Sequence, residues 1–251
     1  HRYSPYGPVW LLASTIPSVL GFGKFVLTLL TFKIFIAAFH FLNAYLIYKT
    51  LQKLNPKLAL FGTAFYALNP LFLIEGVANA HNDIVVASFI LMPIYFVVQK
   101  KLALSFVSQL VGTLIKYIPI VNLPWLLWKA FDKNAEVEKL ILLNLLTLTV
   151  FTFWFSWVGF SVPFIPKGST QVQFQPWYLF WTIPLIALIP KQGLIAASIL
   201  VSIGASLRYI PFLQNGDWST PGTQQFIQQS IAIGLVLAAL VLLFKNPLAK
   251  K

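Results

Sequence analysis

The sequence predicts an all-α, polytopic helical membrane protein, and two observations carry this prediction. Hydrophobic residues make up 58% of the 251 residues and charged residues only 10%, with a mean hydropathy of +0.79. A soluble domain cannot bury that much apolar surface. Lipid offers no hydrogen-bond partner to the backbone N–H and C=O groups, so a membrane-spanning segment is either a helix or a strand of a closed barrel. The long Leu, Ile, Phe and Val runs lack the period-two alternation of barrel strands, which favours helices. We expect one transmembrane helical domain over residues 1–251, with about eight to nine helical segments.

The chain is strongly basic, with 18 Lys and Arg against six Asp and Glu and a net charge of +12. In a soluble protein this excess would suggest a nucleic-acid partner. Here the basic residues lie between apolar runs, which is typical of the signals that orient helices in a membrane. We therefore expect the lipid bilayer as a partner, and no nucleic acid. Because the sequence contains no cysteine, disulfides and thiol chemistry are excluded.

The first half of the chain reads as a short helix followed by full-length spans. Residues 3–8 are extended or turn-like, because a residue that precedes proline avoids the α region. Residues 9–20 are apolar but interrupted by Pro17, which predicts an interfacial or partly buried helix. The predicted spans that follow are residues 25–48, 58–74 and 84–98.

Two shorter apolar runs come next, residues 102–115 and 120–128. At about 1.5 Å per residue neither crosses about 30 Å of hydrocarbon comfortably. They predict a helical hairpin whose tip carries Lys116. The remaining predicted spans are residues 140–157, 177–189, 194–207 and 227–244.

Alternating the faces of these segments gathers most lysines on one side of the membrane, and the positive-inside rule makes that side cytoplasmic. We therefore expect a multi-pass protein of the plasma membrane, with the loop around His81 and the functional face outside. The predicted cytoplasmic side collects Lys49, Lys53, Lys57, Lys100, Lys101, Lys129, Lys133, Lys139, Lys191, Lys245, Lys250 and Lys251.

The segment Asn79-Ala80-His81-Asn82-Asp83 places an imidazole, two carboxamides and a carboxylate between two apolar runs. Ionisable groups beside membrane-depth segments are costly to desolvate and tend to mark functional sites. A polar loop without a function is the alternative. The further candidates for the same face are Glu75, Lys116, Gln175, Trp177, Tyr178 and Arg208.

These residue types suit the binding of a sugar attached to an anionic lipid. A carboxylate accepts hydrogen bonds from sugar hydroxyls, serves as a general base or binds a metal. His81 and Asp83 are two residues apart and would not share a helix face, so a metal site would need ligands from elsewhere in the chain, and we assign no metal ligand. Lys116 and Arg208, at helix ends, can clamp a lipid phosphate, or extend to headgroups without a further role. The carboxamide, hydroxyl and flat rings of Gln175, Trp177 and Tyr178 are typical of carbohydrate sites.

A set of short motifs resembles the polyprenol-phosphomannose-dependent α-mannosyltransferases, and most closely their α-1,6-mannosyltransferase branch in lipoglycan assembly. Each motif alone is short, but their order along the chain is that of the family. They are Ser4-Pro5-Tyr6-Gly7-Pro8-Val9-Trp10, Asn69-Pro70-Leu71, Ala80-His81-Asn82-Asp83, Lys116 with Pro119, and Pro176-Trp177-Tyr178-Leu179-Phe180-Trp181.

The resemblance implies a GT-C-like transmembrane bundle that moves a sugar, expected to be mannose, from a polyprenyl-phosphate donor to a glycan or glycolipid acceptor on the external face. It implies inversion at the sugar, a lipid-linked donor substrate and no other certain cofactor. It also implies a catalytic aspartate in the first external loop, which we expect before His1. The catalytic base is therefore unassigned, and we expect this chain to be a fragment or a reduced homologue.

Two other functions fit the same apolar spans. A transporter or lipid-sugar flippase is the first, although transporters often carry helices broken at mid-membrane, whereas the polar residues here gather at one face. A non-catalytic membrane subunit is the second.

Overall fold

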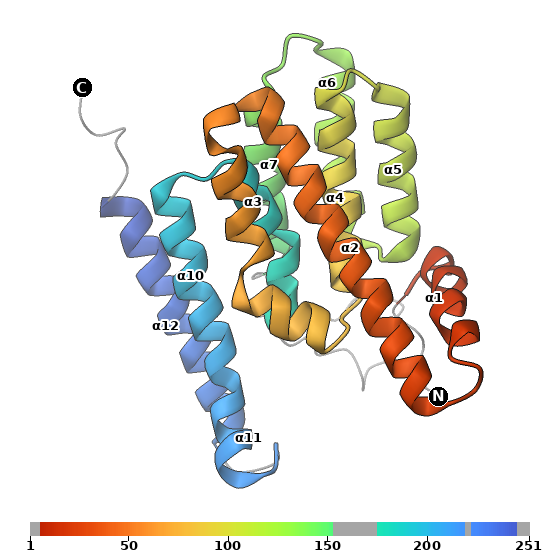
Figure 1. Cartoon of the computed structure of the whole chain (residues 1–251). Helices are drawn as coiled ribbons and strands as arrows, with labels where there is room; N and C mark the ends of the chain where they lie inside the picture. The colour runs from red at the N-terminus through yellow and green to blue at the C-terminus, as the bar shows by residue number, and fades with distance from the viewer. Residues whose placement is uncertain (1–5, 153–174, 219–221, 245–251) are drawn as a thin grey trace, which may run out of the picture. The chain divides into compact units, whose positions relative to one another are not determined.

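The computed structural model describes residues 6–152, 175–218 and 222–244, and within these ranges every regular element is helical (Figure 1). This confirms the all-α prediction. Three of the described helices are long and apolar enough to cross a membrane, or four if one bent pair of helices counts as a single span. The chain divides into two compact units, His1–Ile189 and Pro190–Lys251, which are taken here one at a time. The single domain over residues 1–251 stays a prediction.

The first unit opens with α1 (Pro8–Leu20) and α2 (Phe25–Leu54). Pro8 occupies the first turn of α1, where its missing N–H has no intrahelical partner to lose. The helix continues through Pro17 rather than breaking there, and the hydroxyl of Thr31 in α2 donates to the Pro17 carbonyl at 2.6 Å. At 30 residues α2 is longer than the predicted span and is one of the candidate membrane helices.

The span predicted over residues 58–74 is wrong as a single straight helix. The chain instead forms η1 (Pro56–Leu58) and α3 (Ala59–Ala67), then turns by 60° into a π-helix, η2 (Phe72–Ala78). The cause is Pro70, which lacks an N–H and excludes the preceding residue from the α region. The side chain of that residue, Asn69, caps the break by accepting from the Leu71 N–H at 3.0 Å.

The centre of the first unit is α4 (Asp83–Val98), which packs against both α2 and α5 (Leu102–Ile115). Buried residues lie all around α4, as expected of a helix surrounded by others. Gly112 lets α5 approach α4 closely, because a Cβ there would lie 2.5 Å from the Phe89 Cβ. After α5 the chain continues through η3 (Ile118–Asn122) into α6 (Leu123–Phe131), so the tip of the predicted hairpin lies at Lys116.

The first unit ends with α7 (Val137–Val150), η5 (Pro176–Trp181) and α9 (Ile183–Leu188). The end of the span predicted over residues 140–157 lies outside the described residues. The span predicted over residues 177–189 is a 3₁₀ turn followed by a six-residue helix, and every side chain of α9 is buried. It is too short to count as a membrane span by length.

The second unit is built from two long helical segments. The first runs through α10 (Gln192–Ser206), η6 (Leu207–Tyr209) and α11 (Ile210–Asn215), and qualifies as one candidate span of 24 residues. The second is α12 (Thr223–Phe244). The two segments pack against each other at Gly204 of α10 and Gly234 of α12.

A Cβ on Gly204 would lie 2.7 Å from the Ser230 carbonyl oxygen, and one on Gly234 would lie 3.0 Å from the Leu200 carbonyl oxygen. Small residues of this kind bring helix backbones together in membranes, where apolar burial alone does not drive association.

Gly62→Ala tests the packing of α3. A Cβ at Gly62 would overlap the Ala187 carbonyl oxygen of α9 and the Leu51 side chain of α2. We expect a loss of about 1–3 kcal/mol, the usual cost of overpacking, seen as a lower midpoint of thermal unfolding in detergent. The matched control is Gly193→Ala, whose Cβ would meet its nearest neighbour at 3.6 Å. Equal midpoints for both variants would contradict the close packing of α3.

Candidate functional site

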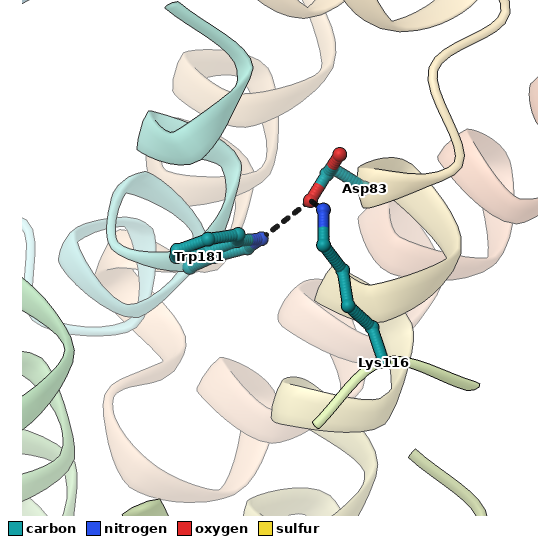
Figure 2. Close-up of polar contacts among 3 residues, drawn as sticks. All are labelled: Asp83, Lys116 and Trp181. Carbon is teal, nitrogen blue, oxygen red and sulfur yellow. Dashed lines mark hydrogen bonds and ion pairs between the residues drawn. The ribbon is translucent and has the colours of Figure 1, made fainter. Parts of the chain in front are cut away.

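Asp83 is the centre of the polar cluster in the first unit. Its side chain is only 2% exposed, and Lys116 Nζ lies 2.7 Å from Oδ1. The indole Nε1–H of Trp181 donates to the same oxygen at 2.8 Å. Figure 2 shows the two side chains meeting that oxygen. Three segments, α4, the residue after α5, and η5, are therefore joined at one carboxylate, and a charge-assisted contact of this length is among the stronger polar contacts in proteins.

The local sequence explains why Asp83 lies there. It is the first residue of α4, in the first turn of the helix, where the helix dipole and the free N–H groups favour a negative charge. The preceding turn is tight, since Ala80 has a φ of +55°, a conformation that costs a non-glycine residue about 1–2 kcal/mol. The turn closes when the Ile84 N–H donates to the His81 carbonyl at 3.2 Å.

Lys116 is directed by the end of α5. It follows Ile115 in an extended conformation, and the carbonyl of Ile115 accepts from the Gly7 N–H at 2.9 Å. A side chain at Gly7 would overlap the Leu114 carbonyl oxygen, so only glycine allows this approach. The contact brings Tyr6 to the cluster, where burial and then the negative charge of Asp83 raise the pKa of its hydroxyl.

Aromatic rings from η5 surround the Lys116 ammonium. Nζ lies 5.2 Å from the centroid of the Trp181 ring and 5.6 Å from that of Tyr178. The two rings are stacked on each other with centroids 4.6 Å apart. Cations are attracted to ring faces at such distances. The ammonium is thus held by one carboxylate and two rings, with 17% of its side chain exposed.

A second carboxylate, Glu75, lies in the π-helix and is also buried, at 5% side-chain exposure. Its Oε2 accepts from the Asn79 carboxamide at 3.2 Å, and His81 Nε2 lies 3.6 Å from the same oxygen. The His81 ring is stacked on Trp177 with centroids 4.0 Å apart and planes 20° apart. The π-helix brings this about, since its i to i+5 bonding joins the His81 N–H to the Gly76 carbonyl at 3.0 Å.

The pKa of His81 lies below its ordinary value. Burial lowers it most; the charges of Asp83 and Glu75 oppose that effect, and the charge of Lys116 adds to it. His81 is therefore the neutral imidazole at pH 7.

A buried polar network on α2 supports both the bend and the start of α4. The carboxamide of Asn43, fully buried, donates to the Tyr66 hydroxyl at 2.9 Å and to the Ile84 carbonyl at 3.0 Å. His40 Nε2 lies 3.1 Å from the Ala67 carbonyl, and the His40 ring is stacked on Tyr66. Sequence reasoning missed Asn43 and Tyr66; the available signal was a carboxamide inside an apolar span.

The structure brings together most of the predicted site residues, and none of their predicted binding roles is tested by their positions. Lys116, predicted as a cation for a donor phosphate, is paired with Asp83. Trp181, which the sequence analysis named only within the motif of residues 176–181, is part of the cluster. The predicted residues that gather in the first unit are Glu75, Asn79, His81, Asp83, Lys116, Trp177 and Tyr178.

The other three predicted residues are Asn82, Gln175 and Arg208. Asn82 is buried, and its carboxamide nitrogen has no hydrogen-bond partner among the described residues. Gln175 directly precedes η5. Arg208 belongs to the second unit, where its guanidinium lies 5.7 Å from the centroid of the Trp218 ring. Its predicted role at a lipid phosphate stays a prediction.

No group of three or more His, Asp or Glu side chains within residues 6–152, 175–218 and 222–244 is arranged to hold a metal ion.

Comparison with protein families identifies the chain. A model of the alpha-(1->6)-mannopyranosyltransferase N-terminal domain matches residues 1–132, which is more than half of the sequence. The chain belongs to the alpha-(1->6)-mannopyranosyltransferase family. This confirms the resemblance to the α-1,6 branch and supports a mannosyltransferase function. No curated protein and no solved structure matches the chain.

The family match covers part of the candidate site. Glu75, His81, Asp83 and Lys116 lie within the matched residues, whereas the aromatic residues of η5 lie beyond them. The site is thus formed by the matched region together with a segment that joins it in the fold.

Lys116→Met tests the ion pair at the centre of the site. Removing the ammonium leaves a buried carboxylate without a charged partner, which typically costs about 3–5 kcal/mol. Asp83→Asn in the same chain removes that unpaired charge, so we expect Lys116→Met/Asp83→Asn to be more stable than Lys116→Met alone. Thermal unfolding in detergent measures the stability of the wild type, of the two single variants and of the double variant, which together form a double-mutant cycle. Additive losses would show that the two side chains are not coupled.

Proposed function

We propose that this chain moves mannose from a polyprenyl-phosphate donor to a hydroxyl of a glycan or glycolipid acceptor. The observation that carries the proposal is the cluster of Asp83, Lys116 and the η5 aromatic rings in a chain of the alpha-(1->6)-mannopyranosyltransferase family. The cluster lies where apolar helices begin and end, at the start of α4 and the end of α5 (Figure 1). A lipid-linked donor carries its phosphate and sugar at the corresponding boundary of the bilayer.

The Lys116 ammonium suits the phosphate of such a donor. It has three N–H donors, and the contact with Asp83 uses one of them. When the bond from the sugar to the phosphate breaks, negative charge grows on the phosphate oxygen. A cation already fixed by a carboxylate and two rings stabilises that charge without reorganising. Asp83 in this proposal orients Lys116.

The remaining residues suit the sugars. Flat rings such as Trp177 and Tyr178 pack against the apolar face of a hexose, while Asn79, Asn82 and Gln175 offer donors and acceptors for its hydroxyls. The proposed donor is itself the activated sugar, so the proposed transfer needs no nucleotide. The choice of mannose as the transferred sugar is supported by the family match alone.

The proposed orientation puts this site outside the cell and the lysine-rich ends of the helices inside. It rests on the distribution of lysines. The C-terminal ends of α2 and α4, together with the residues that directly follow them, carry Lys49, Lys53, Lys57, Lys100 and Lys101.

A lipid-sugar flippase remains the second candidate, and the 60° bend before η2 is the observation that favours it. Broken helices line the substrate path in many transporters. The bend here, however, places Glu75 and His81 beside the η5 aromatic rings rather than at a pseudo-symmetric pair of breaks. An assay that measures both sugar transfer and movement of the lipid-linked sugar separates the two.

Labelling of single cysteines tests the orientation, because the chain has none of its own. We expect a membrane-impermeant maleimide added to intact cells to label Asn79→Cys and to spare Lys100→Cys, at opposite ends of α4. Both residues are exposed. The reverse pattern would put the site in the cytoplasm.

Transfer from polyprenyl-phosphate mannose, measured in membranes that contain the complete gene product, tests the proposed function itself. We expect Lys116→Ala to lower turnover by about 10²–10³-fold, the usual effect of losing one positioned group that stabilises developing charge. Lys133→Ala, an exposed lysine of the loop between α6 and α7, is the matched control and should transfer normally. Flipping of the lipid without sugar transfer by the wild type would favour the second candidate.

A further inference from the structure

A small cavity lies inside the first unit, between the neighbouring helices α4, α5, α6 and α7 (Figure 1). It leaves about 10 Å³ for a water-sized sphere, which is room for about one water molecule. Its apolar wall includes Ile90 of α4, Leu126 of α6 and Leu140 of α7. Three carboxamides also line it: Gln109 of α5, Asn122 at the end of η3 and Asn144 of α7.

This cavity is distinct from the cluster around Asp83. Ile90 follows Asp83 by seven residues in α4, about 10 Å along the helix at about 1.5 Å per residue. The described side chains that line the cavity carry no charge. An uncharged polar cavity of this size suits a small neutral molecule that makes several hydrogen bonds, because a buried ion would need a charged partner.

The carboxamide of Asn122 carries an acceptor without a donor. Its side-chain oxygen has no hydrogen-bond partner among the described residues, and Asn122 is only 4% exposed. A buried acceptor left in this state has lost the hydrogen bonds that water gave it in the unfolded chain, so such groups are rare in folded proteins. A donor bound in the cavity would satisfy the Asn122 oxygen.

The other two carboxamides offer the remaining contacts that a bound water needs. Gln109 and Asn144 are 3% and 5% exposed. Gln109 donates from its amide nitrogen to the Pro119 carbonyl, and Asn144 donates from its own to the Leu140 carbonyl at 2.8 Å. Each amide nitrogen carries two hydrogens, so each keeps a second hydrogen for another acceptor. Three carboxamides on one cavity thus offer the two to four polar partners that hold a buried water.

We propose that this cavity binds one water molecule, which donates to the Asn122 oxygen and accepts from Gln109 or Asn144. The position of Asn122 gives the water a structural role, since Asn122 lies between η3 and α6 and Gln109 already joins α5 to η3. The water connects the turn that follows Lys116 to α5 and α7. It thereby supports the hairpin that carries Lys116, and this role does not depend on mannose transfer by the chain.

NMR contacts between water and the side-chain amides test the proposal directly. In the complete chain in deuterated detergent, the carboxamide protons are assigned by their loss in Gln109→Met, Asn122→Leu and Asn144→Leu. We expect the Gln109 or Asn144 protons to show NOEs to water with the sign of a molecule that stays bound longer than the protein tumbles. Rotating-frame spectra separate these NOEs from proton exchange by their sign.

The matched control is the carboxamide of Asn134, an exposed residue of the loop between α6 and α7, which should show only the brief contacts of surface water. NOEs of the surface kind, or none, at Gln109, Asn122 and Asn144 of the wild type would overturn the proposal. The wild-type spectra decide it even where a variant does not fold.

Asn122→Leu adds a second readout, because leucine keeps the branched shape and removes the acceptor. With a bound water, the variant should lose the water NOEs of Gln109 and Asn144, and its midpoint of thermal unfolding in detergent should fall. Without one, the Asn122 oxygen is an unsatisfied acceptor, and its removal should raise the midpoint. Asn134→Leu should leave the midpoint unchanged. A raised midpoint in Asn122→Leu, or water NOEs that persist in it, would contradict the proposed contact with Asn122.

Discussion

The ion pair between Asp83 and Lys116 is the interaction on which the site depends. Burying either charge alone would cost several kcal/mol, and the pair offsets this cost only where the geometry is good and the remaining polar atoms are satisfied. Here the indole N–H of Trp181 supplies an additional hydrogen bond. One carboxylate therefore fixes the end of α5 and the 3₁₀ turn η5 to the start of α4. Moving any of the three segments would leave a buried polar group without its partner.

The bend at Asn69-Pro70 supplies the second constraint. It ends α3 and allows the next segment to wind as a π-helix, a rare form that occurs mostly at functional sites. The wider winding brings Glu75, Asn79 and His81 to the same side of the chain. Asn43 and His40 of α2 then hold both sides of the bend through Tyr66, Ala67 and Ile84. The bend is thus supported by side chains of a long neighbouring helix as well as by its own backbone hydrogen bonds.

The two carboxylates divide the site into parts with different properties. Around Asp83 the charges are balanced and the side chains are fixed by rings and hydrogen bonds. Around Glu75 the facing groups are the imidazole of His81 and the carboxamide of Asn79. The difference follows from which residue faces each carboxylate, since among the described residues the carboxylate that Lys116 contacts is that of Asp83. In the proposed transfer, the part around Lys116 stabilises the departing phosphate.

Sequence reasoning succeeded where local signals are strong. The bounds of α5 were predicted to the residue, because Lys101 and Lys116 bracket a mostly apolar run that contains no charged residue and no proline, and those of α4 to within one residue. It failed at residues 58–74, where hydropathy outweighed the proline signal that ends α3. The contact between Asp83 and Trp181 joins residues 98 positions apart, and no local pattern encodes such a distance. Asn43 was missed for the same reason, since its partners lie on α3 and α4.

The indole N–H of Trp181 offers the most direct measurement of the central claim that Asp83 joins the three segments. In detergent, its ¹H–¹⁵N resonance can be assigned among the eight tryptophans of the chain by its loss in Trp181→Phe. The account predicts a downfield indole proton, slow to exchange with solvent, that moves upfield and exchanges faster in Asp83→Asn. An indole resonance that exchanges rapidly in the wild type and does not respond to Asp83→Asn would contradict it.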